Sequence, residues 1–219
     1  MELLSSWLDR QRTAVGRLAD EISHSAGCCT GALGEQVQER VDGGDQHTLL
    51  SLEAYYEFLY FFLHVANRMA FQQHGRDASA RLPRKLVPLV AQKARLALNG
   101  DDSPFDWNRG IDATFVETHN KAELDYARCR EVIVDEGVDV SSLERIAAGT
   151  KRRDGGKVFS RGLVNQLAFN VQDALSRPVD AILRLTITST VIGVLRRESI
   201  EKLVREAMQE IKREQGELH

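Results

Sequence analysis

"EAYYEFLYFFLHVANRMAF", Glu53–Phe71, is among the most apolar stretches of the chain, yet polar side chains interrupt it at regular intervals. Successive residues of a helix turn by about 100°, so the polar side chains of this stretch share one arc of roughly 100°. They are Glu53, Glu57, Tyr60, His64, Asn67 and Arg68. The apolar surface that remains is more than twice as wide as that of an ordinary surface helix, which is roughly 100°. We therefore expect a central helix that other helices surround on most sides.

Capping signals set the ends of this central helix at residues 45–75. Asp45 is a suitable N-cap residue, and Gly75 is a suitable residue just beyond the C-terminus. Apolar spacing and capping residues predict further helices over 3–26, 34–41, 104–134, 141–148, 158–175, 178–195 and 200–211, and one that ends at Asn99. Pro83 and Pro88 predict a break or a kink before the helix that ends at Asn99.

Two segments do not have an obvious secondary structure. The glycine-rich "AGCCTGALG" that follows Ser25 reads as a turn, which would end the first helix before Gly27. The β-branched run "LTITSTVIGVL", 185–195, has the composition of a strand, but it lacks a clean alternation and a visible partner strand. We therefore expect it to be helical.

These patterns predict an all-α fold, a multi-helix bundle of seven to nine helices around the central helix, without a sheet. We expect an N-terminal helical bundle over residues 1–148 and a basic, flexible loop over 149–157. The C-terminal amphipathic helices, residues 158–219, should pack on the same bundle.

The composition narrows the class of protein. Hydrophobic residues make up 42% of the chain and charged residues 28%, which is typical of a globular protein. The net charge of −3 gives no general electrostatic reason to bind nucleic acid or an anionic membrane. Three cysteines, two of them adjacent, make a poor disulfide framework and favour a cytoplasmic location. The sequence shows neither a signal peptide nor a membrane span.

The polar stripe of the central helix, Glu53, Glu57, Tyr60, His64 and Arg68, has three interpretations. It is a solvated face, a buried polar network that fixes helix register, or a site that binds a metal or a small ligand. Di-iron bundles need Glu-x-x-His motifs on two helices, and the chain has that spacing only at Glu21–His24. We therefore expect no cofactor, and the less favoured alternative for this stripe is a divalent metal.

Other ligand-type residues are less clearly arranged. His119 and Glu123 lie one turn apart and are candidates to face His64 from a neighbouring helix, although a solvated stripe is the favoured interpretation. Cys28 and Cys29 are adjacent, which is a poor spacing for a zinc site.

The strongest local positive charge lies in the loop "KRRDGGK", 151–157. Its basic side chains are candidate contacts for phosphate groups of a nucleic acid. They are Lys151, Arg152, Arg153 and Lys157. A solvated loop is the simpler interpretation, because nothing else in the sequence points to nucleic-acid binding.

Taken together, these features favour a non-enzymatic interaction or scaffold protein that self-associates, as a homodimer or a higher oligomer, through apolar helix faces. The alternative is a helical-bundle enzyme, or a protein that binds a metal or a small ligand, using the polar stripe. A third possibility is contact with nucleic acid through the basic loop. We expect no membrane partner.

Overall fold

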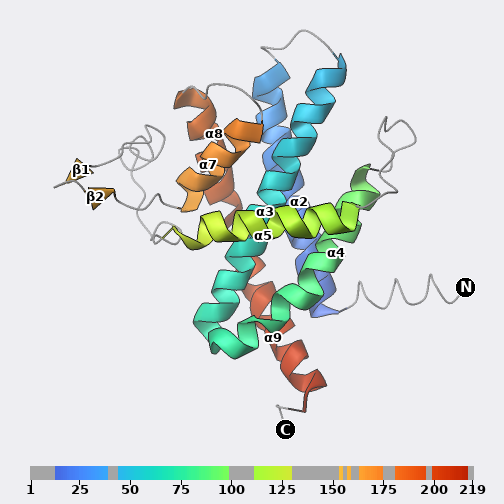
Figure 1. The fold of residues 1–219 in the computed structure, drawn as a ribbon. Helices are drawn as coiled ribbons and strands as arrows, with labels where there is room; N and C mark the ends of the chain where they lie inside the picture. The colour runs from blue at the N-terminus through green and yellow to red at the C-terminus, as the bar shows by residue number, and fades with distance from the viewer. Residues whose placement is uncertain are drawn as a thin grey trace, which may run out of the picture. The chain divides into compact units, whose positions relative to one another are not determined.

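The computed structural model describes residues 13–38, 44–98, 111–129, 153–154, 157–158, 163–174, 181–195 and 199–216. Seven α-helices account for nearly all of these residues (Figure 1). They are α2 (Ala14–Gln38), α3 (Gly44–Ser79), α4 (Arg81–Leu98), α5 (Ile111–Ala127), α7 (Leu163–Ala174), α8 (Ala181–Leu195) and α9 (Ser199–Glu214). The all-α fold class predicted from the sequence is confirmed.

The chain forms two compact units, and each is assembled from segments that are distant in the sequence. Unit 1 comprises Met1–His24, Phe62–Asn120 and Arg197–His219. Unit 2 comprises Ser25–Phe61 and Lys121–Arg196. The sequence-based division of the chain at residues 149–157 stays a prediction.

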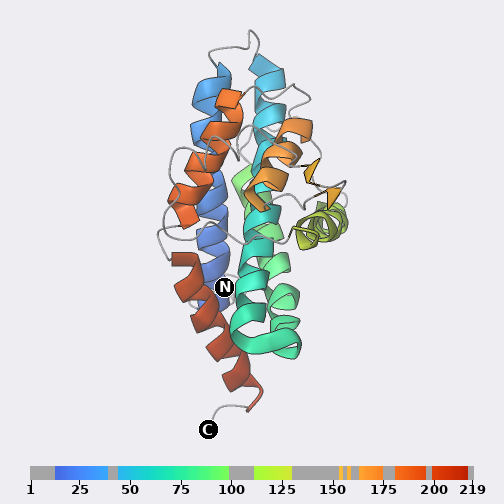
Figure 2. The same ribbon diagram turned by 90° about the vertical axis from the view of Figure 1, so that its left-hand side faces the viewer.

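The last helix, α9, is the clearest amphipathic helix of unit 1. Its buried side chains recur every three or four residues, which places them on one face. They are Ile200, Val204, Ala207, Met208 and Ile211. α9 packs against α4 (Figure 2). The buried side chains of α4 repeat in the same way. The helix predicted over residues 200–211 is confirmed.

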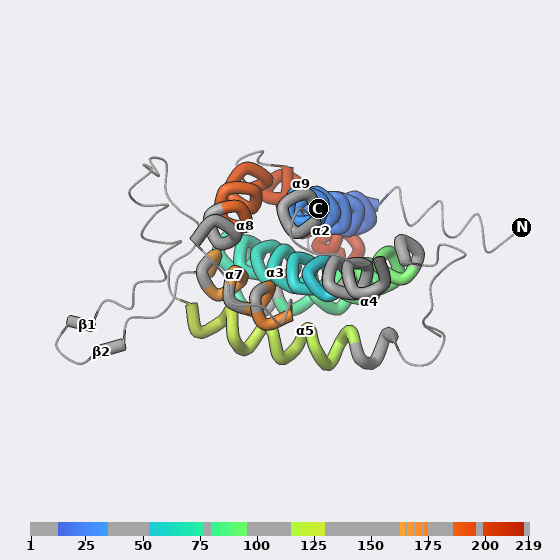
Figure 3. Tube along the Cα trace, turned by 90° about the horizontal axis from the view of Figure 1, so that it is seen from above, coloured from blue at the N-terminus to red at the C-terminus, as the bar shows by residue number. Residues whose placement is uncertain are grey.

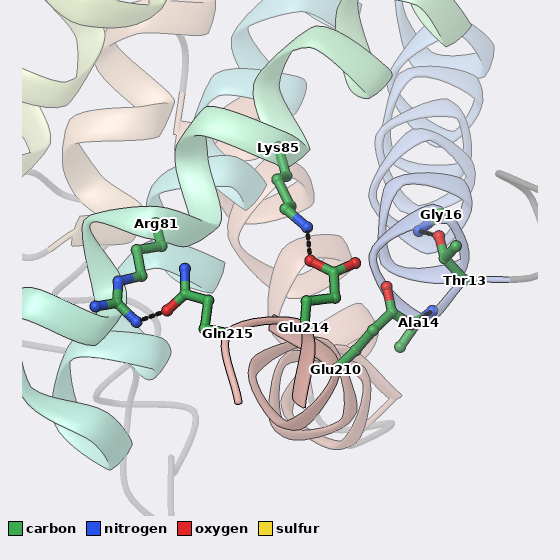
Figure 4. Close-up of polar contacts among 8 residues, drawn as sticks. All are labelled: Thr13, Ala14, Gly16, Arg81, Lys85, Glu210, Glu214 and Gln215. Atoms are coloured by element: carbon green, nitrogen blue, oxygen red, sulfur yellow. Dashed lines mark hydrogen bonds and ion pairs between the residues drawn. The ribbon is translucent and has the colours of Figure 1, made fainter. Parts of the chain in front are cut away.

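Polar contacts at the rim of unit 1 hold α9 against two other helices. Arg17 of α2 pairs with Glu206 at 2.8 Å, and the Ser199 hydroxyl donates to Glu21 of α2 at 2.7 Å. On the other side, Lys85 of α4 pairs with Glu214 (Figure 4). Exposed ion pairs of this kind contribute little energy each, so we assign most of the attachment to the apolar face.

The start of α2 is capped twice. The Oγ1 atom of Thr13 accepts a hydrogen bond from the Gly16 amide at 2.9 Å, as an N-cap residue does. The Glu210 carboxylate of α9 accepts a second bond, from the Ala14 amide, at 2.5 Å (Figure 4). A carboxylate is favoured there because the N-terminus of a helix carries partial positive charge.

Removing the Thr13 cap should weaken the fold measurably. We expect Thr13→Ala to lower the free energy of unfolding by about 1 kcal/mol, because an amide of the first turn loses its acceptor. Urea denaturation measures this difference. Thr13→Ser keeps a hydroxyl and should stay close to the wild type, so equal losses in both variants would show that the cap bond contributes nothing.

Unit 2 contains α7 and α8, which pack against each other (Figure 3). The β-branched run of residues 185–195 lies in α8, so the preference for helix over strand is confirmed. Ile187 and Val191 are buried on this helix, and Val194 is 5% exposed. In the part of the chain that the structure describes, no helix has both the length and the apolar character that crossing a membrane requires.

The turn predicted after Ser25 is wrong, because α2 runs without interruption from Ala14 to Gln38. The first residues of the short helix predicted over 34–41 belong to this same helix. Gly27, Gly31 and Gly34 cost helix stability, but a helical conformation is open to glycine. Tertiary packing outweighs that cost, since Ala26, Cys29 and Leu33 are buried on the inner side of the helix.

The central helix is longer than predicted, but its helical path is interrupted at Gly75, the residue predicted to end it. Gly75 has φ 77° and ψ −178°, so the helical path breaks there before one more helical segment, 76–79. A positive φ is easily adopted only by glycine. Helix α4 then begins ahead of Pro83 and continues through Pro88, so the break lies at Gly75 and not at the prolines.

Three other predicted bounds change. Helix α5 ends at Ala127 rather than near Val134. Directly after Ala127 the chain makes a tight turn, in which the Cys129 amide donates a hydrogen bond to the Tyr126 carbonyl. Val158 lies in a short antiparallel ladder, β1 (Arg153–Asp154) with β2 (Lys157–Val158), and α7 begins later, at Leu163. Several predicted segments lie outside the described residues. They are the helix over 141–148, the beginnings of two other predicted helices, 3–12 and 104–110, and the predicted end of the second of these, 130–134.

Candidate functional site

The polar stripe of α3 changes from exposed to buried along the helix. Glu53 is exposed and Glu57 is partly buried, whereas Tyr60 and His64 are only 4% and 5% exposed. Arg68 is again partly buried. A solvated face is therefore the wrong interpretation for the middle of the stripe. The buried polar network describes that part better.

Glu57 is a residue of the stripe with a shifted pKa. Burial raises the pKa of its carboxyl group from 4.5 to about 7. A hydrogen bond from Asn170 opposes this rise, and the negative charges of Asp173 and Asp125 add to it. The Oε2 atom of Glu57 is buried and accepts no hydrogen bond within the described residues. Glu57 is thus close to half-protonated at neutral pH.

The orientation of the Asn170 amide is set by its neighbour on α7. Gln166 Nε2 donates a hydrogen bond to Asn170 Oδ1 at 2.8 Å. The carbonyl of Asn170 is then occupied as an acceptor, which leaves its NH₂ group to donate. That NH₂ group stabilises the ionised form of Glu57, and it also opposes part of the rise in the pKa of Tyr126.

Tyr126 contributes a fully buried phenol from α5. Its ring lies edge-on to Phe61 of α3, with 5.8 Å between ring centroids and an interplanar angle of 78°. Burial, followed by the charge of Glu57, raises the pKa of Tyr126 well above its usual value of 10. The phenol therefore keeps its proton at every physiological pH and is available as a hydrogen-bond donor.

We refer to these four residues as the Glu57 cluster: Glu57, Tyr126, Gln166 and Asn170. The cluster joins α3, α5 and α7 within unit 2. A carboxyl group with a pKa near 7 can exchange a proton at neutral pH, which acid–base catalysis also requires. The same arrangement can instead fix the register of three helices, as buried polar networks do. Both the proton exchange and the fixing of helix register would depend on the carboxyl group of Glu57.

Sequence reasoning found Glu57 but missed its partners. Tyr126 lies on the buried side of α5 with Phe115, His119 and Ala122, a spacing of four, three and four residues that predicts burial. Nothing in that spacing points to α3. The i,i+4 spacing of Gln166 and Asn170 is the only sequence signal for the amide pair.

The candidate facing residues are buried to different degrees. His119 is 6% exposed on α5, and Glu123 is partly buried on the same helix. His64 and His119 belong to unit 1, whereas Glu123 belongs to unit 2. The approach of His119 and Glu123 to His64 stays a prediction.

The arrangement of potential metal ligands and of the cysteines is as follows in the described residues. Across the ranges that the structure describes, no group of three or more His, Cys, Asp or Glu side chains is arranged to hold a metal ion. Cys28 is exposed, Cys29 and Cys129 are buried, and none of the three is in a disulfide. The adjacent pair lies on a helix and not in the predicted turn.

The basic loop is described only in part. Lys151 and Arg152 lie outside the described residues. The backbones of Arg153 and Lys157 take part in the β1–β2 ladder, where Arg153 is opposite Val158 and Lys157 is opposite Asp154. The proposed phosphate contacts of these four basic residues stay a prediction.

Helix α5 has a second notable side, which faces solvent. Leu124 is 64% exposed and Val116 is 39% exposed, and both are large apolar side chains. They lie within an arc of about 80°, with Asn120 midway between them and Ala127 in the same arc. Asn120 and Ala127 are also exposed. We call Val116, Asn120, Leu124 and Ala127 the α5 face.

A comparison with protein-family models, curated proteins and solved structures gave no match.

Proposed function

We propose that the protein is a non-enzymatic helical interaction protein that self-associates through the α5 face. The observation that carries this proposal is the exposure of Leu124, 64%, on the same side of a helix as Val116. Scattered single apolar residues are normal on a protein surface, but neighbouring ones on one helix face favour an interaction site. Burying a leucine side chain contributes about 1.5–3 kcal/mol.

Two other apolar helix faces of the described residues are largely used inside the chain. The inner face of α9 is buried, including Val204 and Met208. The aromatic side chains of the central helix are buried as well, with Phe58, Phe61 and Phe62 each 0% exposed. Association through the aromatic face of α3 or through α9 would therefore compete with the core, whereas association through α5 would not.

A substitution on the α5 face should separate the copies. We expect Leu124→Glu to lower the molar mass in solution from that of a dimer to that of a single chain of 24.6 kDa, because a charge would have to be buried at the interface. Size-exclusion chromatography with light scattering measures the mass directly.

Phe71 provides a matched control. It is 52% exposed on α3, so it is also a large apolar side chain in solvent, but it lies outside the α5 face. Phe71→Glu should leave the dimer intact. Dissociation in both variants, or in neither, would count against the α5 face, and circular dichroism checks that each variant remains helical.

A second candidate function is suggested by the Glu57 cluster: binding of a small ligand, or acid–base catalysis, by a helical bundle. The observation in its favour is a carboxyl group with a pKa of about 7 and a buried Oε2 atom. Metal analysis of the purified protein and ligand-screening by thermal shift would test it, using Glu57→Gln as the comparison. Bound metal, or a shift lost only in that variant, would favour this function over the first.

A further inference from the structure

The charges beside the α5 face complement themselves under twofold symmetry. Glu117 and Lys121 are exposed, and both lie on one flank of the face, at about 100° and 140° from Val116. We infer that the partner of this face is α5 of a second copy, antiparallel to the first, with a twofold axis at the level of Asn120. This inference rests on the proposed self-association and adds the partner's element and direction.

The apolar residues fit this arrangement because they are equally distant from Asn120. Val116 precedes Asn120 by four residues and Leu124 follows it by four. A twofold axis that runs between two antiparallel helices at the level of Asn120 therefore places Val116 of each copy opposite Leu124 of the other. Each contact occurs twice, as an isologous interface requires.

The charged residues fit the same axis. In an antiparallel pair related by such an axis, the same flank of each helix faces its counterpart. Measured along the helix axis, Lys121 of the second copy then lies about two residues, or about 3 Å, from the level of Glu117 in the first copy. A carboxylate accepts several hydrogen bonds, so this contact is compatible with contacts that Glu117 makes within its own chain. Two such opposite-charge contacts form across the axis.

Self-complementarity is the reason to choose a second copy over an unrelated protein. One surface supplies both the apolar pairs and the charge pairs, and it needs no residue from another sequence. Complementary charges of this kind mainly set orientation and exclude wrong partners. The Glu117–Lys121 contacts would therefore determine the direction in which two α5 helices meet.

Charge exchange tests the direction. Glu117→Lys alone places positive charges on both flanks, and Lys121→Glu alone places negative charges there. Each variant should dimerise at least about tenfold more weakly than the wild type, because like charges meet across the axis. An equimolar mixture of the two should recover dimers, and added salt should weaken them. Sedimentation equilibrium provides the dissociation constants.

The double variant with both exchanges is the matched control. It restores opposite charges within the helix and across the axis, so it should dimerise as the wild type does. If Leu124→Glu abolishes the dimer but the mixture of single variants fails to recover it, the antiparallel arrangement is overturned and the self-association stands. If the wild type itself has the mass of one chain at all concentrations, both fall together.

Discussion

Replacing Glu57 by glutamine should make the stability of the protein much less dependent on pH. The carboxyl group has a pKa of about 7 in the folded chain and 4.5 as its reference value, so the folded state holds its proton more tightly. Below pH 4.5 the group is protonated in both states and has no effect. As the pH rises from 4.5 to 7, the wild type loses stability, by about 3 kcal/mol in total, and the loss is complete above pH 7.

Glu57→Gln removes this titration. At pH 8 the variant should be more stable than the wild type by up to about 3 kcal/mol, because a buried amide replaces an ionised carboxylate. At pH 4.5 the two proteins should be similar. Urea denaturation at a fixed protein concentration measures both values, and the fixed concentration keeps any effect of dimerisation constant.

Glu53 supplies the control for this experiment. It lies one turn earlier on α3, and its side chain is exposed. Glu53→Gln should leave the pH profile of the wild type unchanged. A Glu57→Gln profile that runs parallel to the wild type from pH 4.5 to pH 8 would show that the fold does not hold the proton of Glu57.

The second large effect is expected at Phe61. Its ring is 0% exposed and packs edge-on against Tyr126. Phe61→Ala should lower the free energy of unfolding by about 3–5 kcal/mol, because it leaves a cavity and removes an aromatic pair. Thermal or urea unfolding monitored by circular dichroism measures the loss.

Two further variants identify the source of this loss: one separates the lost volume from the lost aromatic contact, and the other compares a buried ring with an exposed one. Phe61→Leu retains most of the volume, so it should lose far less than Phe61→Ala. Phe71→Ala removes an exposed ring and should change the stability by about 0.5 kcal/mol or less. Equal effects at the buried and the exposed position would contradict the packing described for α3.

Helix periodicity predicted the elements whose apolar spacing is uninterrupted. The pattern of α9 predicted its buried face, and the wide apolar surface around Glu53–Phe71 predicted that α3 is largely enclosed. The helical structure of α8 followed from the absence of strand alternation, although its composition favours a strand. In each case the local pattern and the tertiary packing favour the same structure.

The sequence was misleading where local preference and packing disagree. Gly27, Gly31 and Gly34 favour a turn on local grounds. They nevertheless lie in α2, because Ala26, Cys29 and Leu33 on the same helix are buried. Pro88 lies inside α4, exposed to solvent. Glycine and proline set a cost that packing can exceed, so they mark ends of helices only where the apolar pattern also stops.

The candidate site was predictable only on its own helix. Glu57 stood out because a polar group on a nearly all-apolar helix must find a partner or remain costly. Its partners Tyr126 and Asn170 come from α5 and α7, and single-sequence patterns carry no information about contacts between helices distant in the chain. The exposure of Leu124 was also missed, because a large apolar side chain is by itself expected to be buried.

Cross-linking at Asn120 tests the central claim, self-association through the α5 face, most directly. In a Cys28→Ser background, which removes the exposed thiol, Asn120→Cys places a cysteine at the centre of the face. Mild oxidation should give a covalent dimer of twice 24.6 kDa on a non-reducing gel, whereas Arg84→Cys on the exposed side of α4 should not. A single-chain band for Asn120→Cys, or equal cross-linking at Arg84→Cys, would contradict the account.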